Sequence, residues 1–230
     1  MRVLPNNLVI DSTLSATNAN VSYPIANIKH YFLKKIFKAT DASTTITATF
    51  DTVQNIDCCY IGYTNATVAT LKLYSASSVL LATKTINVST NGGIFSTVQG
   101  VKYVTLDLAS ASNVYLGTFA VGDSYTMPDP DNNIIKGLLD NSTSYSSTDG
   151  QYALNKTQWL KKLELSFTIV GIDLYNEIYA LFSQVDRPIW VDIYEELNNA
   201  INPYYAQVEF EEDSQSWHKY TFKLTCTEAR

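Results

Sequence analysis

Residues 45–50 have the sequence TITATF, residues 56–65 the sequence IDCCYIGYTN, and residues 70–74 the sequence TLKLY. The first stretch alternates polar and apolar residues, which is the pattern of a β-strand with one buried face. A turn motif, YPIAN, precedes them at residues 23–27, and a polar loop follows the second stretch. Strands, turns and a loop in this order predict the first half of a small β-sandwich and do not indicate a catalytic site.

Further strand patterns continue on both sides of this stretch. They are separated by breaks that contain Asn, Ser, Gly or Asp, and they fall at residues 3–10, 44–50, 56–63, 70–74, 79–86, 101–108 and 114–121. Many short strands at such spacing are typical of a sandwich or jelly roll. Residues 12–22 are small and polar, and we expect them to form an irregular arm that could reach a neighbouring subunit.

A domain boundary is predicted at the segment MPDPDNN, residues 127–133, because each proline removes a backbone donor and restricts φ. The predicted domains are residues 1–127, the sandwich, and residues 128–230, a second β-rich domain. That domain has strand patterns at residues 134–139, 151–155, 159–169, 188–194, 204–211 and 217–225. One helix is expected at residues 173–184, where apolar residues recur at helical spacing. The fold class is therefore mainly β.

Composition excludes several kinds of partner. Charged residues make up 17% of the chain, against about 25% in typical proteins. The net charge of −6 offers no basic surface for duplex nucleic acid. No secretory signal and no apolar stretch long enough to span a membrane is found. The three cysteines, two of them adjacent, show no disulfide or zinc spacing, which favours a reducing compartment.

One acidic segment partly matches a calcium loop. Asp129, Asp131, Asn133 and Asp140 provide oxygen ligands at suitable offsets, but Ile134 stands where the sharp turn needs glycine. An acidic linker between domains is the favoured interpretation, so no metal site is predicted.

Catalytic motifs are not found in the sequence. His30 and His218 lie beside no nucleophile or metal-ligand pattern, and no phosphate-binding glycine loop occurs. The carboxylates at residues 195–196 and 209–213 are interpreted as solvated hairpin ends. We therefore expect no catalytic residue, no cofactor and no enzyme activity. A glycan-degrading enzyme that uses the carboxylates of residues 209–213 remains a third hypothesis.

The chain holds 16 tyrosines and three tryptophans. Most of them are expected to pack in the core, but aromatic rings also stack on sugars and are enriched in protein interfaces. Tyr63, Asn65 and Tyr74 are the candidate ligand-binding residues, since a sugar site needs exposed rings beside a hydrogen-bonding loop.

Taken in order, several motifs resemble the discoidin-type (galactose-binding-like) jelly roll found in virion proteins of tailed bacteriophages. They are YPIAN at 23–27, TITATF at 45–50, IDCCYIGYTN at 56–65, and the exit LGTFAVG at 116–122 followed by Met127-Pro128. The resemblance covers roughly residues 20–128. In one place the chain departs from the family pattern: YFLKK at residues 31–35 replaces a tryptophan and a short acidic run. The second half is similar to the domain that accompanies this module in phage tail and tail-tip proteins.

The resemblance implies a structural virion protein of a tailed bacteriophage, in the tail, tail tip, baseplate or neck. Its partners would be copies of itself in a homo-oligomeric ring and other virion proteins, and it would be assembled in the host cytoplasm. The alternative is a carbohydrate-binding module that attaches to host-surface glycans. No nucleic acid partner and no membrane span are expected.

Overall fold

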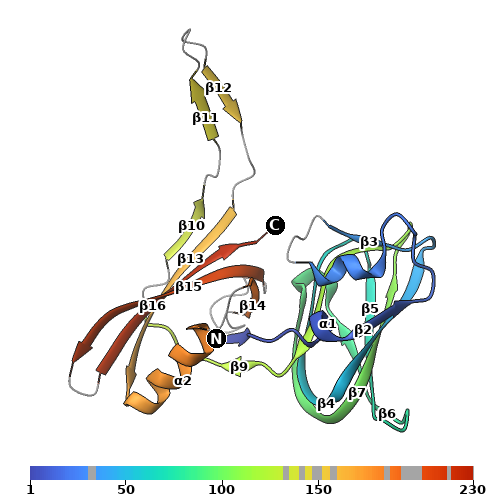
Figure 1. Ribbon diagram of the computed structural model, residues 1–230, viewed down its shortest axis with the longest axis horizontal. Helices are drawn as coiled ribbons and strands as arrows, with labels where there is room; N and C mark the ends of the chain where they lie inside the picture. Colours follow the sequence, from blue (N-terminus) through green and yellow to red (C-terminus); the bar gives the residue numbers. More distant parts are fainter. Residues whose placement is uncertain are drawn as a thin grey trace. The chain divides into compact units, whose positions relative to one another are not determined.

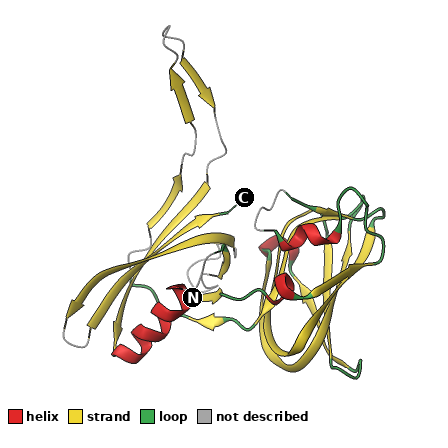
Figure 2. Ribbon diagram, viewed as in Figure 1, coloured by secondary structure: helices red, strands yellow, loops and turns green. Residues whose placement is uncertain are grey.

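The computed structural model describes residues 1–30, 35–131, 135–139, 143–146, 152–155, 160–183, 187–192, 204–216 and 219–229. The fold is mainly β, as the sequence predicts (Figures 1 and 2). The chain divides into two compact units. Unit 1 holds Met1–Met127 with Arg187–Tyr205, and unit 2 holds Pro128–Asp186 with Ala206–Ala229.

This division differs in one respect from two consecutive domains, 1–127 and 128–230. The chain leaves unit 1 after Met127, but Arg187–Tyr205 returns to it. The physical reason is strand pairing: β14 (Ile189–Asp192) lies antiparallel to β1 (Arg2–Leu4) in unit 1. A pairing between segments so distant in the chain leaves no local pattern in the sequence.

Unit 1 is built on a jelly-roll sandwich. Its strands follow the order β3-β8-β4-β7-β5-β6, and β2 also pairs with β4. The bounds are β2 Thr13–Ala16, β3 Phe37–Lys38, β4 Ser43–Thr64, β5 Val68–Tyr74, β6 Leu80–Ile86, β7 Gly92–Ala109 and β8 Tyr115–Gly122. Two short 3-10 helices, η1 (Ile25–Lys29) and η2 (Val88–Thr90), complete the connections. The predicted sandwich is confirmed.

The strands predicted at 44–50 and 56–63 form one long strand, β4. Its register with β7 shifts between Thr49 and Gln54 and again before Cys58, so the strand bends there. From Cys58 onward, β4 also pairs with β8. Bulges of this kind bend a strand without ending it, and one strand can then serve both sheets of a sandwich.

The core of the sandwich follows from alternation along the strands. Ile46 on β4, Leu71 on β5 and Leu106 on β7 are fully buried between the sheets, while Thr45 and Thr47 face the opposite side. Burial of each large aliphatic side chain stabilises the fold by about 1.5–3 kcal/mol.

The N-terminal segment differs from two predictions. The strand expected at residues 3–10 ends at Leu4, and a short helix, α1 (Leu8–Asp11), follows it. Pro5 has no backbone N–H to donate, and the Asn7 side chain caps the helix by accepting from Val9 N.

The irregular arm predicted at residues 12–22 is also corrected. Thr13–Ala16 form strand β2, which pairs with β4 of the same chain, and Ala19 bridges to Ala39. Asn18 then donates to Asp41 at 2.9 Å and to Ser43 O at 2.7 Å. The segment is therefore an edge of its own sheet, and its polar composition reflects a strand exposed on one side.

A small third layer covers the outer face of β4 and β8. It consists of β9 (Tyr125–Thr126), β1 and β14, paired in that order. The Trp190 ring of β14 stacks on Tyr60 of β4, with centroids 5.2 Å apart and planes 12° from parallel. Because of this layer, residues 56–62 of β4 are buried on both faces.

The layer is held to the sandwich by a buried carboxylate. Asp57, 4% exposed, accepts hydrogen bonds from Ser124 N and Ser124 Oγ, both at 2.7 Å, and from Arg2 at 3.1 Å. Three donors satisfy the charge, two of them from the chain segment that leads into β9 and one from β1.

Unit 2 contains an antiparallel sheet in the order β10-β13-β16-β15 and one helix. The bounds are β10 Ile135–Leu139, β13 Leu160–Val170, α2 Ile172–Ser183, β15 Tyr204–Ser216 and β16 Lys219–Glu228, with a separate hairpin of β11 Thr143–Ser146 and β12 Tyr152–Asn155. The helix predicted at 173–184 is confirmed within one residue at each end. Tyr175 of α2 stacks on Tyr220 of β16 at 4.8 Å, which joins the helix to the sheet.

An ion-pair cluster lies on this sheet. The Glu164 carboxylate is 2.8 Å from Lys162 Nζ and 2.7 Å from Lys223 Nζ. Hydrogen bonds from Lys162 and Lys223 lower the pKa of Glu164 to about 2. The lysines are about one third exposed, so salt is expected to screen the interaction.

We predict that Lys223→Gln raises the pKa of Glu164, measured by NMR titration of its side-chain carboxyl carbon. Because the folded pKa is below the ordinary value of 4.5, the stabilisation is complete above that pH and is lost as pH falls through about 2. Lys219→Gln, at the exposed start of β16, is the control and is expected to leave the pKa unchanged. An ordinary pKa for Glu164 in the unmodified protein would contradict the assignment.

Candidate functional site

Loops gather at one end of the sandwich and are held together by hydrogen bonds. Val114 N donates to Asp41 O at 3.0 Å, and Thr67 N donates to Ala109 O at 2.8 Å. We call this the loop end; it comprises residues 39–43, 64–68 and 109–115. Its backbone is tied across three separate chain segments, so side chains on it have a defined position.

Asn65, a predicted site residue, lies at the loop end, and its side chain forms hydrogen bonds that hold the loop together. Its Nδ2 donates to Ser112 Oγ and to Asn113 O, both at 3.1 Å, and its Oδ1 accepts from Tyr115 N at 2.9 Å. Both amide hydrogens are used within the protein. Asn65 therefore positions the loop.

Tyr63, a second predicted site residue, is exposed beside Asn65. Its φ of 52° lies in the left-handed region, which few non-glycine residues adopt and which is common at functional sites. The side chain is 53% exposed, and its ring lies 5.8 Å from that of Tyr115 at an angle of 51°. The loop end thus offers an open aromatic ring supported by a second one.

An open groove of about 500 Å³ is also found at the loop end. Parts of β4, β5 and β7 form it, together with the residues that follow β2. The lining is dominated by hydroxyl, amide and carboxylate groups: Thr17, Asn18, Asp41, Ser43, Thr44, Thr45, Val68, Thr70, Asp107, Leu108 and Ala109. Both charged groups of this lining are carboxylates.

Asp107 is held in place at the floor of the groove. Its Oδ1 accepts from Thr45 Oγ1 at 2.6 Å, and its Oδ2 is 2.8 Å from Lys72 Nζ. Burial alone would raise the pKa of Asp107, but the hydrogen bonds from Lys72 and Thr45 outweigh it and lower the pKa. Asp107 is therefore an ionised acceptor with a fixed orientation.

Asp41 and two threonines retain hydrogen-bonding capacity. Asp41 Oδ2 accepts from Asn18, whereas Oδ1 has no partner within the described part of the chain. The Thr44 hydroxyl is buried without a partner, again among the described residues. The side-chain hydroxyl of Thr70, in β5, also lines the groove and makes no hydrogen bond to the described residues. These groups can accept or donate to a bound molecule.

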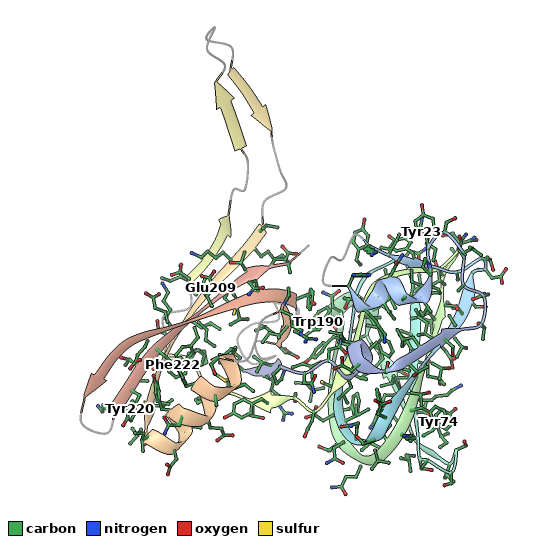
Figure 3. All side chains as sticks on the ribbon, in the orientation of Figure 1. Tyr23, Tyr74, Trp190, Glu209, Tyr220 and Phe222 are labelled. Carbon is green, nitrogen blue, oxygen red and sulfur yellow. The ribbon has the colours of Figure 1, made fainter. Side chains whose placement is uncertain are left out.

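Tyr74, the third predicted site residue, is not brought together with the other two. Val68 pairs with Ala109 at the loop end, whereas Tyr74 pairs with Tyr103 six residues further along β5. At about 3.4 Å per residue this separates them by about 20 Å. Figure 3 shows Tyr74 and Tyr23 at opposite ends of the sandwich. The Tyr23 ring centroid lies 4.3 Å from Nζ of Lys38, which immediately precedes the loop end.

Other candidate groups take ordinary structural positions. Asp131 anchors the start of unit 2 by accepting from Thr168 at 2.8 Å, while Asn133 and Asp140 lie outside the described residues. Glu209 is exposed on β15. Within the described ranges, no three His, Cys, Asp or Glu side chains are grouped to hold a metal ion.

The cysteines are all buried and free in the structure. Burial raises the pKa of the Cys58 and Cys59 thiols, and the neighbouring Asp57 raises that of Cys58 further. Thiols in this state are poor nucleophiles. His218 and residues 31–34, part of the segment that departs from the family pattern, lie outside the described residues.

Sequence reasoning missed the groove residues Asp41, Thr45, Thr70 and Asp107. Thr45, Asp107 and Thr70 come from three strands and meet only through register, Thr45 opposite Asp107 and Asp107 opposite Thr70. Asp41 comes from the loop before β4. The alternating pattern of the sequence indicates that the strand residues among them are polar and outward-facing, but it does not indicate which residues lie next to them on neighbouring strands.

Comparison with known proteins gives similarities of fold. No family model and no curated protein matches the chain. Among solved structures, a chitosan-binding module of a Paenibacillus chitosanase/glucanase is 15% identical, covers 51% of this chain and 99% of its own, and has a TM-score of 0.43. A Streptococcus pneumoniae fucose-binding module is 13% identical, over 51% and 94%, also at 0.43. The lectin domain of lectinolysin, solved with Lewis B antigen, is 10% identical, over 50% and 95%, at 0.43.

All three are described as modules or domains that bind sugars. Among the described helices, none has the length and apolar character needed to cross a membrane.

Proposed function

We propose that the sandwich of unit 1 is a carbohydrate-binding module and that the groove at its loop end holds the sugar. The observation that carries this proposal is the groove lining: an open depression of about 500 Å³ in which hydroxyls, an amide and two carboxylates converge. The proposal rests on this lining and not on the low-identity neighbours. Binding sites for small ligands are concave and carry a few well-placed polar groups.

The chemistry of the lining suits sugar hydroxyls. A sugar hydroxyl both donates and accepts, so it can donate to the free Oδ1 of Asp41 and exchange hydrogen bonds with Thr70. Val68, 54% exposed, provides an apolar surface for the C–H groups of a sugar ring. The exposed Tyr63 ring at the same end adds a stacking surface.

The charge of the groove selects among sugars. Its charged side chains are Asp41 and Asp107, and Asp107 is already paired with Lys72. An acidic glycan would be repelled by Asp41, whereas an uncharged or aminated sugar would not. The proposed ligands are therefore uncharged or aminated glycans.

The test is binding to homo-oligosaccharides of glucose, mannose, galactose, N-acetylglucosamine and glucosamine, each β-1,4-linked, with galacturonic acid as the acidic series. We expect binding to at least one of the first five and none to the sixth. Asp41→Asn and Thr70→Val are expected to weaken that binding about tenfold, the effect of losing roughly 1.4 kcal/mol of hydrogen bonding.

Two matched variants serve as controls. Asp51→Asn removes an exposed carboxylate from the bend of β4, and Thr97→Val removes an exposed hydroxyl from the first half of β7. Both lie outside the groove lining, so binding should be unchanged. Failure of all six series to bind, or equal losses from groove and control variants, would contradict the proposal. As a binding module, the protein is expected to leave every oligosaccharide uncleaved.

A structural role in a tailed-phage virion is the second candidate. It is favoured by the ordered motifs and by apolar side chains at the edge of the sandwich, where Val79, Leu80 and Leu81 are 56%, 50% and 40% exposed. Leu80 and Leu81 belong to β6, the last strand in the sheet order, and exposed edges of this kind favour contacts between subunits. Light scattering should then give a mass that is a multiple of that of one chain, and mass spectrometry should find the protein in purified particles. A monomer absent from particles would exclude this role.

A further inference from the structure

The outer face of the sandwich continues from the groove in a regular pattern. Strands β4, β7 and β5 are in register, so three cross-strand rows of side chains point to the same side. The rows are Thr45–Asp107–Thr70, Thr47–Thr105–Lys72 and Thr49–Tyr103–Tyr74. We call these nine residues the polar face.

The polar face is open to solvent along its length. Thr47, Thr105 and Lys72 in its middle row are half-buried, while Ile46, Leu71 and Leu106 behind it are completely buried. Side chains on a sheet that is covered on one side only have this contrast. The middle row therefore offers the hydroxyls of Thr47 and Thr105 to a molecule lying on the face, beside a lysine that is ion-paired with Asp107.

The far row ends in an aromatic pair. The rings of Tyr74 and Tyr103 stack with centroids 4.7 Å apart and planes 8° from parallel. This spacing matches that of neighbouring strands, so the rings stand side by side on the sheet. Two phenol groups and Leu80, opposite Tyr74 on β6, form an amphipathic patch. The patch lies four residues along the strands from the Thr45–Asp107–Thr70 row of the groove, or about 14 Å at about 3.4 Å per residue.

We propose that the groove is one end of an extended site, and that its occupant is a polysaccharide chain running along the polar face to the Tyr74–Tyr103 pair. This inference rests on the proposed sugar binding in the groove. A single sugar or a disaccharide fills the groove alone, whereas a longer chain also meets the middle row and the tyrosines. Continuous polar side chains join the two ends without an interruption by a large apolar residue.

The polar face also explains why the aromatic pair lies so far from the loops. A terminal sugar needs only the loop end, where Tyr63 and Tyr115 are found. Side chains that stack at the opposite end of the same face are useful to a ligand that reaches both ends. The substrate class is therefore an internal stretch of an uncharged or aminated polysaccharide.

Calorimetry with chains of one to six units, from the five uncharged or aminated series above, tests the extended site. We expect affinity to rise about tenfold between the dimer and the hexamer, since a stacked or edge-bound ring adds a modest contribution. Tyr103→Thr is expected to abolish this gain and to leave dimer affinity unchanged. Tyr179→Ala, an equally conspicuous exposed tyrosine on α2, is the control and should change neither value.

A second measurement uses the unmodified protein and therefore does not depend on whether the Tyr103→Thr variant folds. In the unmodified protein, NMR amide shifts at residues 72–74 and 103–105 should change on adding a hexamer but not a dimer. Equal affinity for dimer and hexamer in every series that binds would overturn the extended site and leave sugar binding in the groove intact. Absence of binding to all series would overturn both.

Discussion

Replacing Trp190 with alanine is expected to lower the free energy of unfolding of unit 1 by about 3–5 kcal/mol, the range for large aromatic residues in a core. Trp190 is 2% exposed and stacks on Tyr60, and its ring centroid lies 5.8 Å from that of Tyr205. A Cβ at Gly62 would lie 3.2 Å from the Trp190 ring, which shows how closely β4 approaches it. Removing the ring would leave a cavity over the C-terminal part of β4, at Tyr60 and Gly62. Chemical denaturation followed by circular dichroism measures the loss.

Two variants separate packing from other effects. Trp190→Phe keeps an aromatic ring and removes an indole N–H that has no hydrogen-bond partner in the described structure, so a smaller loss is expected. Tyr179→Ala removes a ring that is 50% exposed on α2 and should change the stability little. A Trp190→Ala protein as stable as the unmodified one would contradict the return of Arg187–Tyr205 to unit 1.

Gly92→Ala is the second substitution with a large expected effect, a loss of about 3 kcal/mol from backbone strain and overlap together. Gly92 begins β7 with φ of 115°, a conformation that side chains disfavour. An added Cβ would lie 2.1 Å from Cys59 O and 2.8 Å from Tyr60 Cα, and both contacts are with backbone that cannot move independently. The β4–β7 pairing would have to shift, and we expect a lower melting temperature in thermal unfolding.

The adjacent glycine provides the matched control. Gly93 has an ordinary φ, and a Cβ there would meet no atom within 4 Å. Gly93→Ala is expected to leave the melting temperature unchanged or slightly raised, because alanine restricts the unfolded chain. Equal changes in melting temperature from the two substitutions would contradict the close approach of Gly92 to the backbone of Cys59 and Tyr60.

The elements of the sandwich could be predicted because their signals are local. Alternation in residues 45–50 marks a strand with one buried side, and Ile46, Ala48 and Phe50 are the buried residues. The helix of unit 2 follows equally from apolar spacing. The jelly-roll class then follows from many short strands with polar breaks.

Features that depend on distant pairing could not be predicted. Thr13–Ala16 lacks a strong strand pattern and forms β2 because β4 offers it an edge. Residues 189–192 have a strand signal, but only the pairing of Val191 with Val3 reveals that they belong to unit 1. A single amino-acid sequence contains no record of which strand pairs with residues 13–16 or with residues 189–192.

The candidate site shows the same limit. Tyr63 and Asn65 were predicted together from one loop, and the structure places them together. Tyr74 was grouped with them by residue type, yet it lies at the other end of β5. Asp107 meets Thr45 and Thr70 only through the register of three strands, and Asp41 joins the groove from the loop before β4.

Mapping the bound ligand on the protein decides whether the groove binds a sugar. The oligosaccharide that binds in the panel is titrated into isotope-labelled protein, and amide chemical shifts are followed by NMR. We expect the shift changes to concentrate at residues 41–45, 68–70 and 107–109. Shifts confined to unit 2, or the absence of shifts with every series, would contradict sugar binding in the groove.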